Sequence, residues 1–207
     1  MMRRRHRRPV AGALRLATVL ALAACVRRPT EAPAPRAAGP ARVASSAPPP
    51  PAPEDAVRLR ARGLAVPVLG VYPDQLRDSF HDARSGGRTH RALDILAPRG
   101  TPVLAADDGR VARVGTNALG GRTVYLVDAT GAFAYYYAHL DRYRTGLAEG
   151  MQLAKGDVIG YVGTTGNAPP NAPHLHFQVL RVHGGRRWWE GAPIDARPYF
   201  VTGGIER

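Results

Sequence analysis

Two histidines stand one residue apart in the stretch APHLHFQV, at His174 and His176. The surrounding residues are typical of a buried β-strand, in which alternate side chains point to the same face. We therefore expect the two imidazoles to project side by side, about 6.6 Å apart along the strand. Imidazole serves both as a metal ligand and as a general acid or base, so the pair predicts a metal site or a catalytic site. The spacing alone leaves open which histidine would bind a metal.

Three further residues offer related chemistry elsewhere in the chain. His90 and Asp94 lie four residues apart in HRALD, and His139 ends the apolar run YYYAHL. A catalytic zinc site commonly has three protein ligands and keeps one position for water. In a fully extended strand, His90 and Asp94 would be about 13 Å apart, too far for bonds of about 2 Å to one ion. We therefore expect the chain to bend between them, with Asp94 at the start of a strand over residues 94–97.

Short strands must position these residues. Between about Leu64 and Phe200, apolar runs rich in β-branched and aromatic residues alternate with turn residues, mainly glycine. Strands without intervening helices predict antiparallel sheets and hence an all-β domain. On its expected strand, His139 should share a face with Tyr135 and Tyr137. The clearest runs cover residues 101–106, 109–115, 122–129, 131–140, 156–163 and 174–182.

The order HxxxD, YAHL and HLHF in an all-β chain resembles the lysostaphin-type (LytM-like) zinc metalloendopeptidases of peptidoglycan. The resemblance covers roughly residues 64–200. It implies a lysostaphin-type fold of antiparallel sheets and one catalytic Zn²⁺. Carried over residue by residue, it also implies that His90, Asp94 and His176 are the zinc ligands.

The same resemblance implies that His139 and His174 are the catalytic pair beside the water that the zinc activates. One of them would orient or deprotonate the water, or stabilise the tetrahedral oxyanion, and which does which stays open. The family usually has glycine in the middle of HxxxD, where this chain has Ala92. Glycine there would ease the expected bend, but alanine adopts most turn conformations at negative φ. We therefore expect the site to be active.

The beginning of the chain predicts targeting. Residues 1–8, MMRRRHRR, are basic, and the apolar run that follows is shorter than the ~20 residues of a membrane-spanning helix. The run ends at Leu22-Ala23-Ala24-Cys25, which resembles a bacterial lipobox, and Cys25 is the only cysteine of the chain. We therefore expect a lipoprotein signal peptide over residues 1–24 and a lipid anchor at Cys25.

A linker should connect the anchor to the folded domain. Residues 25–57 are dominated by Pro, Ala and Arg, a composition that cannot bury a core and favours disordered, extended chain. Residues 1–53 hold ten arginines and one acidic residue, so they carry most of the net charge of +13. The remaining domain is only mildly basic, which does not argue for nucleic-acid binding. We expect the zinc metallopeptidase domain over residues 58–207.

Together these features predict a lipid-anchored, zinc-dependent endopeptidase that hydrolyses the peptide cross-links of peptidoglycan. The alternative is a non-catalytic envelope regulator that activates another cell-wall hydrolase, but such regulators usually lose the metal ligands. A zinc peptidase that acts on proteins is a third interpretation. The expected partners are peptidoglycan, a membrane and, in addition, an envelope protein regulator.

The residue after the expected anchor bears on localisation. Val26 is not the aspartate associated with inner-membrane retention in enteric bacteria. In a cell with two membranes, this favours an outer-membrane lipoprotein that faces the periplasm. The substrate class would then be cross-links that contain D-alanine and diaminopimelate.

Overall fold

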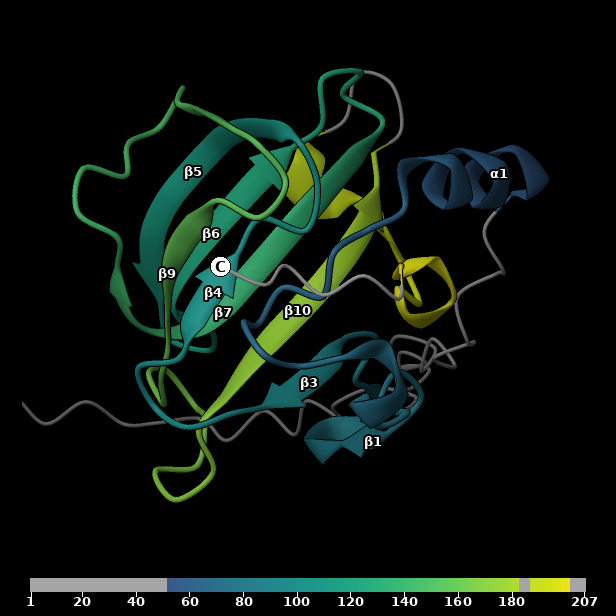
Figure 1. Ribbon diagram of the computed structural model, residues 1–207. Helices are drawn as coiled ribbons and strands as arrows, with labels where there is room; N and C mark the ends of the chain where they lie inside the picture. The colour runs from purple at the N-terminus through teal and green to yellow at the C-terminus, as the bar shows by residue number, and fades with distance from the viewer. Residues whose placement is uncertain (1–51, 183–186, 202–207) are drawn as a thin grey trace, which may run out of the picture. The chain divides into compact units, whose positions relative to one another are not determined.

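The computed structural model describes residues 52–182 and 187–201, which are coloured in Figure 1. The expected signal peptide (1–24), the expected lipidation site Cys25 and nearly all of the expected linker (25–57) lie outside these residues. Within the described part, no helix is both long and apolar enough to cross a membrane.

One α-helix, α1 (Pro53–Arg62), opens the described part. Acidic residues in its first turn and arginines in its last turn complement the helix dipole. Leu59 is buried in the hydrophobic core, and the buried Asp55 forms an ion pair with Arg181 of a distant strand. The folded part therefore begins before the boundary expected between residues 57 and 58, which falls inside this helix. The Pro- and Ala-rich composition hid the helix because its core contact depends on a single leucine.

Charged side chains fasten the end of α1 to the strands. Arg62 donates hydrogen bonds to the buried carboxylates of Asp107 (2.7 Å) and Asp128 (2.5 Å). Lys155, the only lysine of the chain, donates through Nζ to the carbonyls of Arg62 (2.6 Å) and Gly63 (2.8 Å). Carbonyls at the end of a helix lack intrahelical partners and attract cations. The helix is thus held to the domain by four charge-assisted hydrogen bonds.

The strands form one nine-stranded sheet and a separate two-stranded hairpin, β1 with β2 (Figure 1). The main sheet follows the order β11-β10-β7-β6-β5-β8, while β3 pairs with β10, and β9 pairs with β7 and β4. All strand pairings are antiparallel, and each of the six expected runs overlaps a strand, so the predicted all-β class is confirmed. The strands are β1 (Ala83–Arg84), β2 (Arg88–Thr89), β3 (Leu93–Leu96), β4 (Pro102–Leu104), β5 (Gly109–Asn117), β6 (Gly121–Val127), β7 (Phe133–Tyr143), β8 (Gln152–Leu153), β9 (Val158–Val162), β10 (His174–Arg181) and β11 (Ala192–Ile194).

Short 3₁₀ turns complete the described part of the chain. They are η1 (Pro73–Gln75), η2 (Ser85–Gly87), η3 (Trp188–Glu190) and η4 (Arg197–Tyr199). The η2 turn joins β1 to β2, so it forms the tip of the small hairpin.

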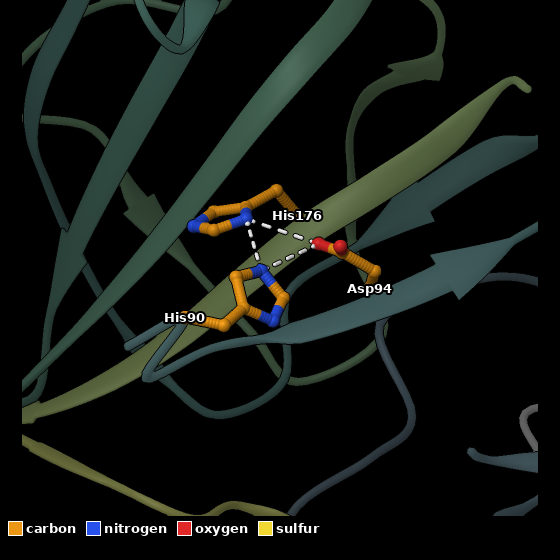
Figure 2. A group of neighbouring side chains, drawn as sticks. All are labelled: His90, Asp94 and His176. Atoms are coloured by element: carbon orange, nitrogen blue, oxygen red, sulfur yellow. Dashed lines mark hydrogen bonds and ion pairs between the residues drawn. The ribbon is translucent and has the colours of Figure 1, made fainter. Parts of the chain in front are cut away.

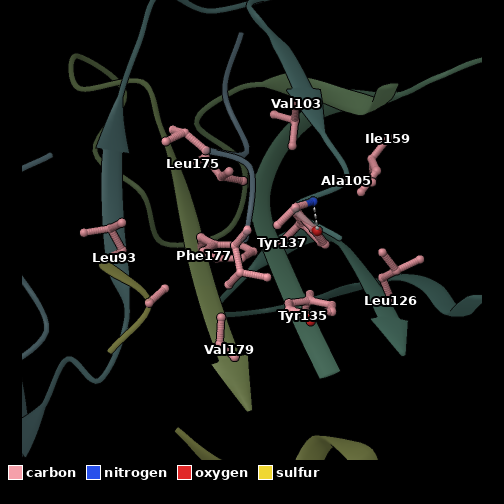
Figure 3. Close-up of a cluster of buried hydrophobic side chains, with 14 of the residues drawn as sticks. Leu93, Val103, Ala105, Leu126, Tyr135, Tyr137, Ile159, Leu175, Phe177 and Val179 are labelled. Atoms are coloured by element: carbon pink, nitrogen blue, oxygen red, sulfur yellow. Dashed lines mark hydrogen bonds between the residues drawn. The ribbon is translucent and has the colours of Figure 1, made fainter. Parts of the chain in front are cut away.

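Strands β7 and β10 separate the hydrophobic core from the opposite face of the sheet. Tyr137 and Phe177 are paired across these strands and are both buried in the core (Figure 3). The Tyr137 hydroxyl accepts a hydrogen bond from the Ala106 N–H (3.0 Å), which satisfies its polar atom. Because side chains alternate along a strand, the adjacent residues Tyr136 and His176 point away from the core. This second face carries the histidines.

Candidate active site

Three side chains of types that can bind a metal ion converge at the junction of β3 and β10 (Figure 2). His176 of β10 is the cross-strand partner of Asp94 on β3, and His90 lies just before β3. The Oδ1 atom of Asp94 lies 2.9 Å from Nε2 of His90 and 3.0 Å from Nδ1 of His176. The two ring nitrogens are themselves 3.0 Å apart. The sequence therefore identified a group of residues that the fold does bring together.

The bend predicted between His90 and Asp94 is present, but at an unexpected residue. Arg91 has a left-handed backbone with φ 55°, whereas Ala92 does not and is buried. The strand begins at Leu93, one residue before the expected start. The position where the family usually has glycine is thus not the one that makes the turn, so alanine there causes no backbone strain.

Ser79 contacts the His90 side chain and the Asp94 backbone, and no motif in the sequence pointed to it. Its carbonyl lies 2.8 Å from Nδ1 of His90 and, since a carbonyl only accepts, Nδ1 donates this hydrogen bond and leaves Nε2 to face Asp94. Its hydroxyl accepts a hydrogen bond from the Asp94 N–H (3.1 Å). Such partners fix the tautomer and orientation of metal ligands.

His139 and His174 lie beside this group and are held in the same way. Nδ1 of His139 donates to the Thr165 carbonyl, and Nδ1 of His174 donates to the Ala172 carbonyl, each at 2.8 Å. The two ring centroids are 4.9 Å apart, and the His139 centroid is 5.6 Å from that of His176. In each ring Nδ1 is thus committed to a backbone carbonyl, which leaves Nε2 for other partners beside His90, Asp94 and His176.

A β-bulge places His139 in the site. Across β6 and β7, Arg122 pairs with Leu140 and Val124 pairs with Tyr137, which leaves one extra residue on β7. His139 lies in this bulge and accommodates the extra residue with a left-handed backbone at φ 62°. The expectation that it shares a face with Tyr135 and Tyr137 is therefore wrong, because the bulge turns it to the face of His176. Both tyrosines are buried in the core instead.

Two glycines bring the partner of His139 into place. A Cβ on Gly121 would lie 2.4 Å from the backbone nitrogen of Gly166, so the two backbones touch where side chains would collide. This contact joins the β5–β6 hairpin to the loop that carries Thr165. The Thr165 hydroxyl also donates to the Leu140 carbonyl (2.8 Å) and accepts from the Arg122 N–H (3.0 Å). Neither Thr165 nor this contact is visible as a sequence motif.

The pKa values of His139, His176 and Asp94 all lie below their ordinary values. Burial lowers the pKa of His139 to about 4, against the opposing effect of its hydrogen bond to Thr165. Burial also lowers the pKa of His176. For Asp94, burial raises the pKa, but the close contacts of its carboxylate with the rings of His176 and His90 outweigh this effect and hold the pKa below its ordinary value. At pH 7 these pKa values leave His139 and His176 neutral and Asp94 ionised. A general base must be neutral to accept a proton, and metal ligands must be deprotonated at the binding atom.

All five predicted site residues line one pocket of about 520 Å³. One side of this pocket is basic and comes from the β1–β2 hairpin and the chain before it. Another part is apolar and includes the exposed side chains of Leu96 and Leu119. The basic side consists of Arg77, Arg84 and Arg88.

The converging atoms fit a zinc ion. Two imidazole nitrogens and one carboxylate oxygen form a donor set typical of catalytic zinc, and the ligand atoms lie within 4.8 Å of one another. Tetrahedral ligands with bonds of about 2.0–2.2 Å are roughly 3.3–3.6 Å apart, so shifts of about half an ångström would suffice. His90 would bind through Nε2 and His176 through Nδ1, because those atoms face Asp94.

Comparison with known proteins identifies the family. A sequence profile of peptidase family M23 matches residues 88–195, just over half of the chain. The chain belongs to peptidase family M23. The matched region includes all five histidine and aspartate residues of the pocket, so the resemblance read from HxxxD, YAHL and HLHF is confirmed at the level of the family.

Curated relatives of this M23 domain are endopeptidases by name. The chain is 34% identical over 139 residues to the L-Ala–D-Glu endopeptidase of Bacillus subtilis, an alignment that covers 64% of this chain and 42% of the relative. It is 36% identical over 101 residues to the peptidoglycan DD-endopeptidase ShyC of Vibrio cholerae, covering 49% and 22% of the two chains. The alignments thus span less than half the length of these relatives.

A solved structure supports the same fold. The crystal structure of a zinc containing peptidase from Vibrio cholerae matches with a TM-score of 0.53 and 27% sequence identity. The match covers 66% of this chain and 40% of that one. The lysostaphin-type arrangement of antiparallel strands is therefore shared with a solved peptidase.

Proposed function

We propose that this M23 domain is a zinc-dependent endopeptidase that hydrolyses the peptide cross-links of peptidoglycan. The observation that carries the proposal is the convergence of three ligand atoms beside a second histidine pair in one open pocket. The names of the curated relatives support peptidoglycan as the substrate class. We assign His90, Asp94 and His176 as ligands of one Zn²⁺, and His139 and His174 as catalytic residues.

The catalytic chemistry follows from the orientation of each ring. A zinc ion bound by the three ligands would polarise the scissile carbonyl and lower the pKa of water to about 7. His139 and His174 each have Nδ1 committed to a backbone carbonyl, so proton transfer must use Nε2. One ring accepts the proton of the attacking water at Nε2 and then passes this same proton to the leaving amine, while the other ring orients the water by accepting a hydrogen bond from it at Nε2. The backbone carbonyls keep both rings aligned throughout.

The peptide bond that is hydrolysed is a separate question from the catalytic chemistry. The names of the two curated relatives specify different peptide bonds, so family membership does not select one. We propose cross-links that contain D-alanine and diaminopimelate, which follows from the expected outer-membrane location.

Digestion of purified sacculi tests the function. We expect the purified full-length chain to release soluble muropeptides with new amino termini, to lose this activity with a chelator and to regain it with zinc. Mass spectrometry of the products identifies the bond. No release with zinc supplied, together with stimulation of a separate wall hydrolase, would instead establish the regulator.

We also propose that Cys25 carries a lipid anchor and that the protein is an outer-membrane lipoprotein facing the periplasm. The support is the basic start, the short apolar run and the lipobox-like end of that run. Cells that express the protein should incorporate labelled palmitate into it, and the Cys25→Ser variant should not. Equal labelling of the two proteins would contradict the anchor.

A further inference from the structure

An arginine contacts the proposed metal site from outside the set of ligands. Arg84 ends strand β1, and its Nη2 atom donates to Oδ2 of Asp94 at 2.5 Å. The other carboxylate oxygen, Oδ1, faces His90 and His176, as the dashed lines in Figure 2 show. The two oxygens of Asp94 therefore have separate partners, one on the arginine and one at the metal-binding atoms.

We propose that Arg84 is a positioning residue that holds Asp94 in one-oxygen coordination. This inference rests on the proposed zinc function. With Oδ2 engaged by the guanidinium, only Oδ1 is offered to a metal, and the carboxylate cannot rotate to present both oxygens. Three protein donor atoms then remain, which is the number that leaves a catalytic zinc site open for water.

Folding stability gives little reason for this contact. The side chain of Arg84 is 41% exposed and that of Asp94 is 21% exposed, and ion pairs this accessible contribute little to stability. Arg84 also lies directly opposite Arg88 in the β1–β2 hairpin, and like charges opposite each other are unfavourable. The hairpin thus places two arginines together at the rim of the pocket, and one of them binds a ligand carboxylate.

The backbone fixes the distance from Arg84 to the site. The hairpin turn uses Gly86 and Gly87, both with positive φ, so the strand returns at once toward His90. The His90 N–H donates to the Asp82 carbonyl (2.9 Å), which ties the end of β2 to the residue before β1. The hairpin therefore supplies Arg84 on one strand and leads into a ligand on the other.

Two opposite effects of the guanidinium on zinc can be separated. Its charge repels the cation, whereas its hydrogen bond orients the carboxylate. Loss of a partner that orients a ligand typically weakens metal binding by about 10- to 100-fold. Arg84→Gln keeps a donor without the charge, and Arg84→Lys keeps the charge with a single-point donor. If the hydrogen bond acts by orienting the carboxylate, both of these variants should bind zinc more tightly than Arg84→Ala does.

Zinc affinity and a cobalt spectrum test the proposal. The full-length protein and each variant are titrated with zinc against a competing chelator, and the visible bands of the Co²⁺ forms report coordination number. We expect Arg84→Ala to bind zinc about 10- to 100-fold more weakly, with cobalt bands that weaken as coordination increases. Arg99→Ala is the matched control, since Arg99 is also an exposed arginine paired with a carboxylate, Asp141, but outside the pocket.

The outcomes separate this inference from the proposed function. An Arg84→Ala protein with wild-type zinc affinity and an unchanged cobalt spectrum overturns the positioning role and leaves the zinc site intact. Equal weakening in Arg99→Ala also overturns it, because the effect would then be general. A wild-type chain that binds no zinc overturns the proposed function itself.

Discussion

The His176→Ala variant should lose zinc and hydrolysis together. The imidazole supplies one of three ligand atoms, and its Nδ1 lies 3.0 Å from both Asp94 Oδ1 and His90 Nε2. Without it, the two remaining ligands cannot hold a catalytic ion at neutral pH. We expect kcat/KM on a muropeptide to fall by at least about 1,000-fold, since zinc contributes several kcal/mol to such reactions. Bound zinc, measured by elemental analysis after dialysis, should fall with it.

The fold should survive this substitution. His176 points to the pocket, whereas its neighbour Phe177 is the residue that fills the core. Circular dichroism of the variant should therefore resemble that of the wild type. His81→Ala is the matched control, because His81 is an exposed histidine outside the pocket. Retention of bound zinc and wild-type turnover by His176→Ala would contradict the ligand assignment.

Replacing His139 or His174 by alanine should give a different result, in which zinc stays and turnover is lost. Each ring lies beside the ligands and donates its Nδ1 proton to the backbone. Loss of a positioned general acid or base typically lowers the rate by about 10²- to 10⁴-fold. We expect kcat to fall by this factor in either variant, with zinc content near that of the wild type.

A double variant distinguishes shared from independent roles. If His139 and His174 act on one proton-transfer sequence, His139→Ala/His174→Ala should lose little more than either single variant. Losses that multiply would indicate independent contributions. Loss of zinc from either single variant, to the extent seen with His176→Ala, would contradict the division of the five residues into ligands and catalytic residues.

Much of the site could be predicted because the alternation of side chains along a strand depends on local sequence alone. The alternation of β10 correctly placed His174 and His176 on one face, and the distance argument correctly required a bend before Asp94. The position of His139 could not be deduced from alternation, because it depends on a bulge created by pairing with β6. A bulge depends on how two strands pair, so it cannot be deduced from the sequence of one strand.

The contacts that support the site also could not be predicted from the sequence. Ser79 contacts His90 through its carbonyl, which every residue has, and the Asp94 N–H through its hydroxyl, but it lies in a segment without a recognisable motif. Arg84, which contacts Asp94, lies in a segment without a motif. Thr165, which accepts a hydrogen bond from His139, is distant from that histidine in the sequence. Helix α1 was missed because composition suggested an extended linker, while its stability comes from tertiary contacts of Leu59 and Arg62.

The most direct test of the account is a zinc titration of the metal-free protein, with muropeptide hydrolysis measured at each addition. The account predicts that hydrolysis is absent at first, rises in proportion to bound zinc and reaches its plateau at one zinc ion per chain. Full hydrolysis by chelator-treated protein whose zinc content is far below one ion per chain would contradict the central claim.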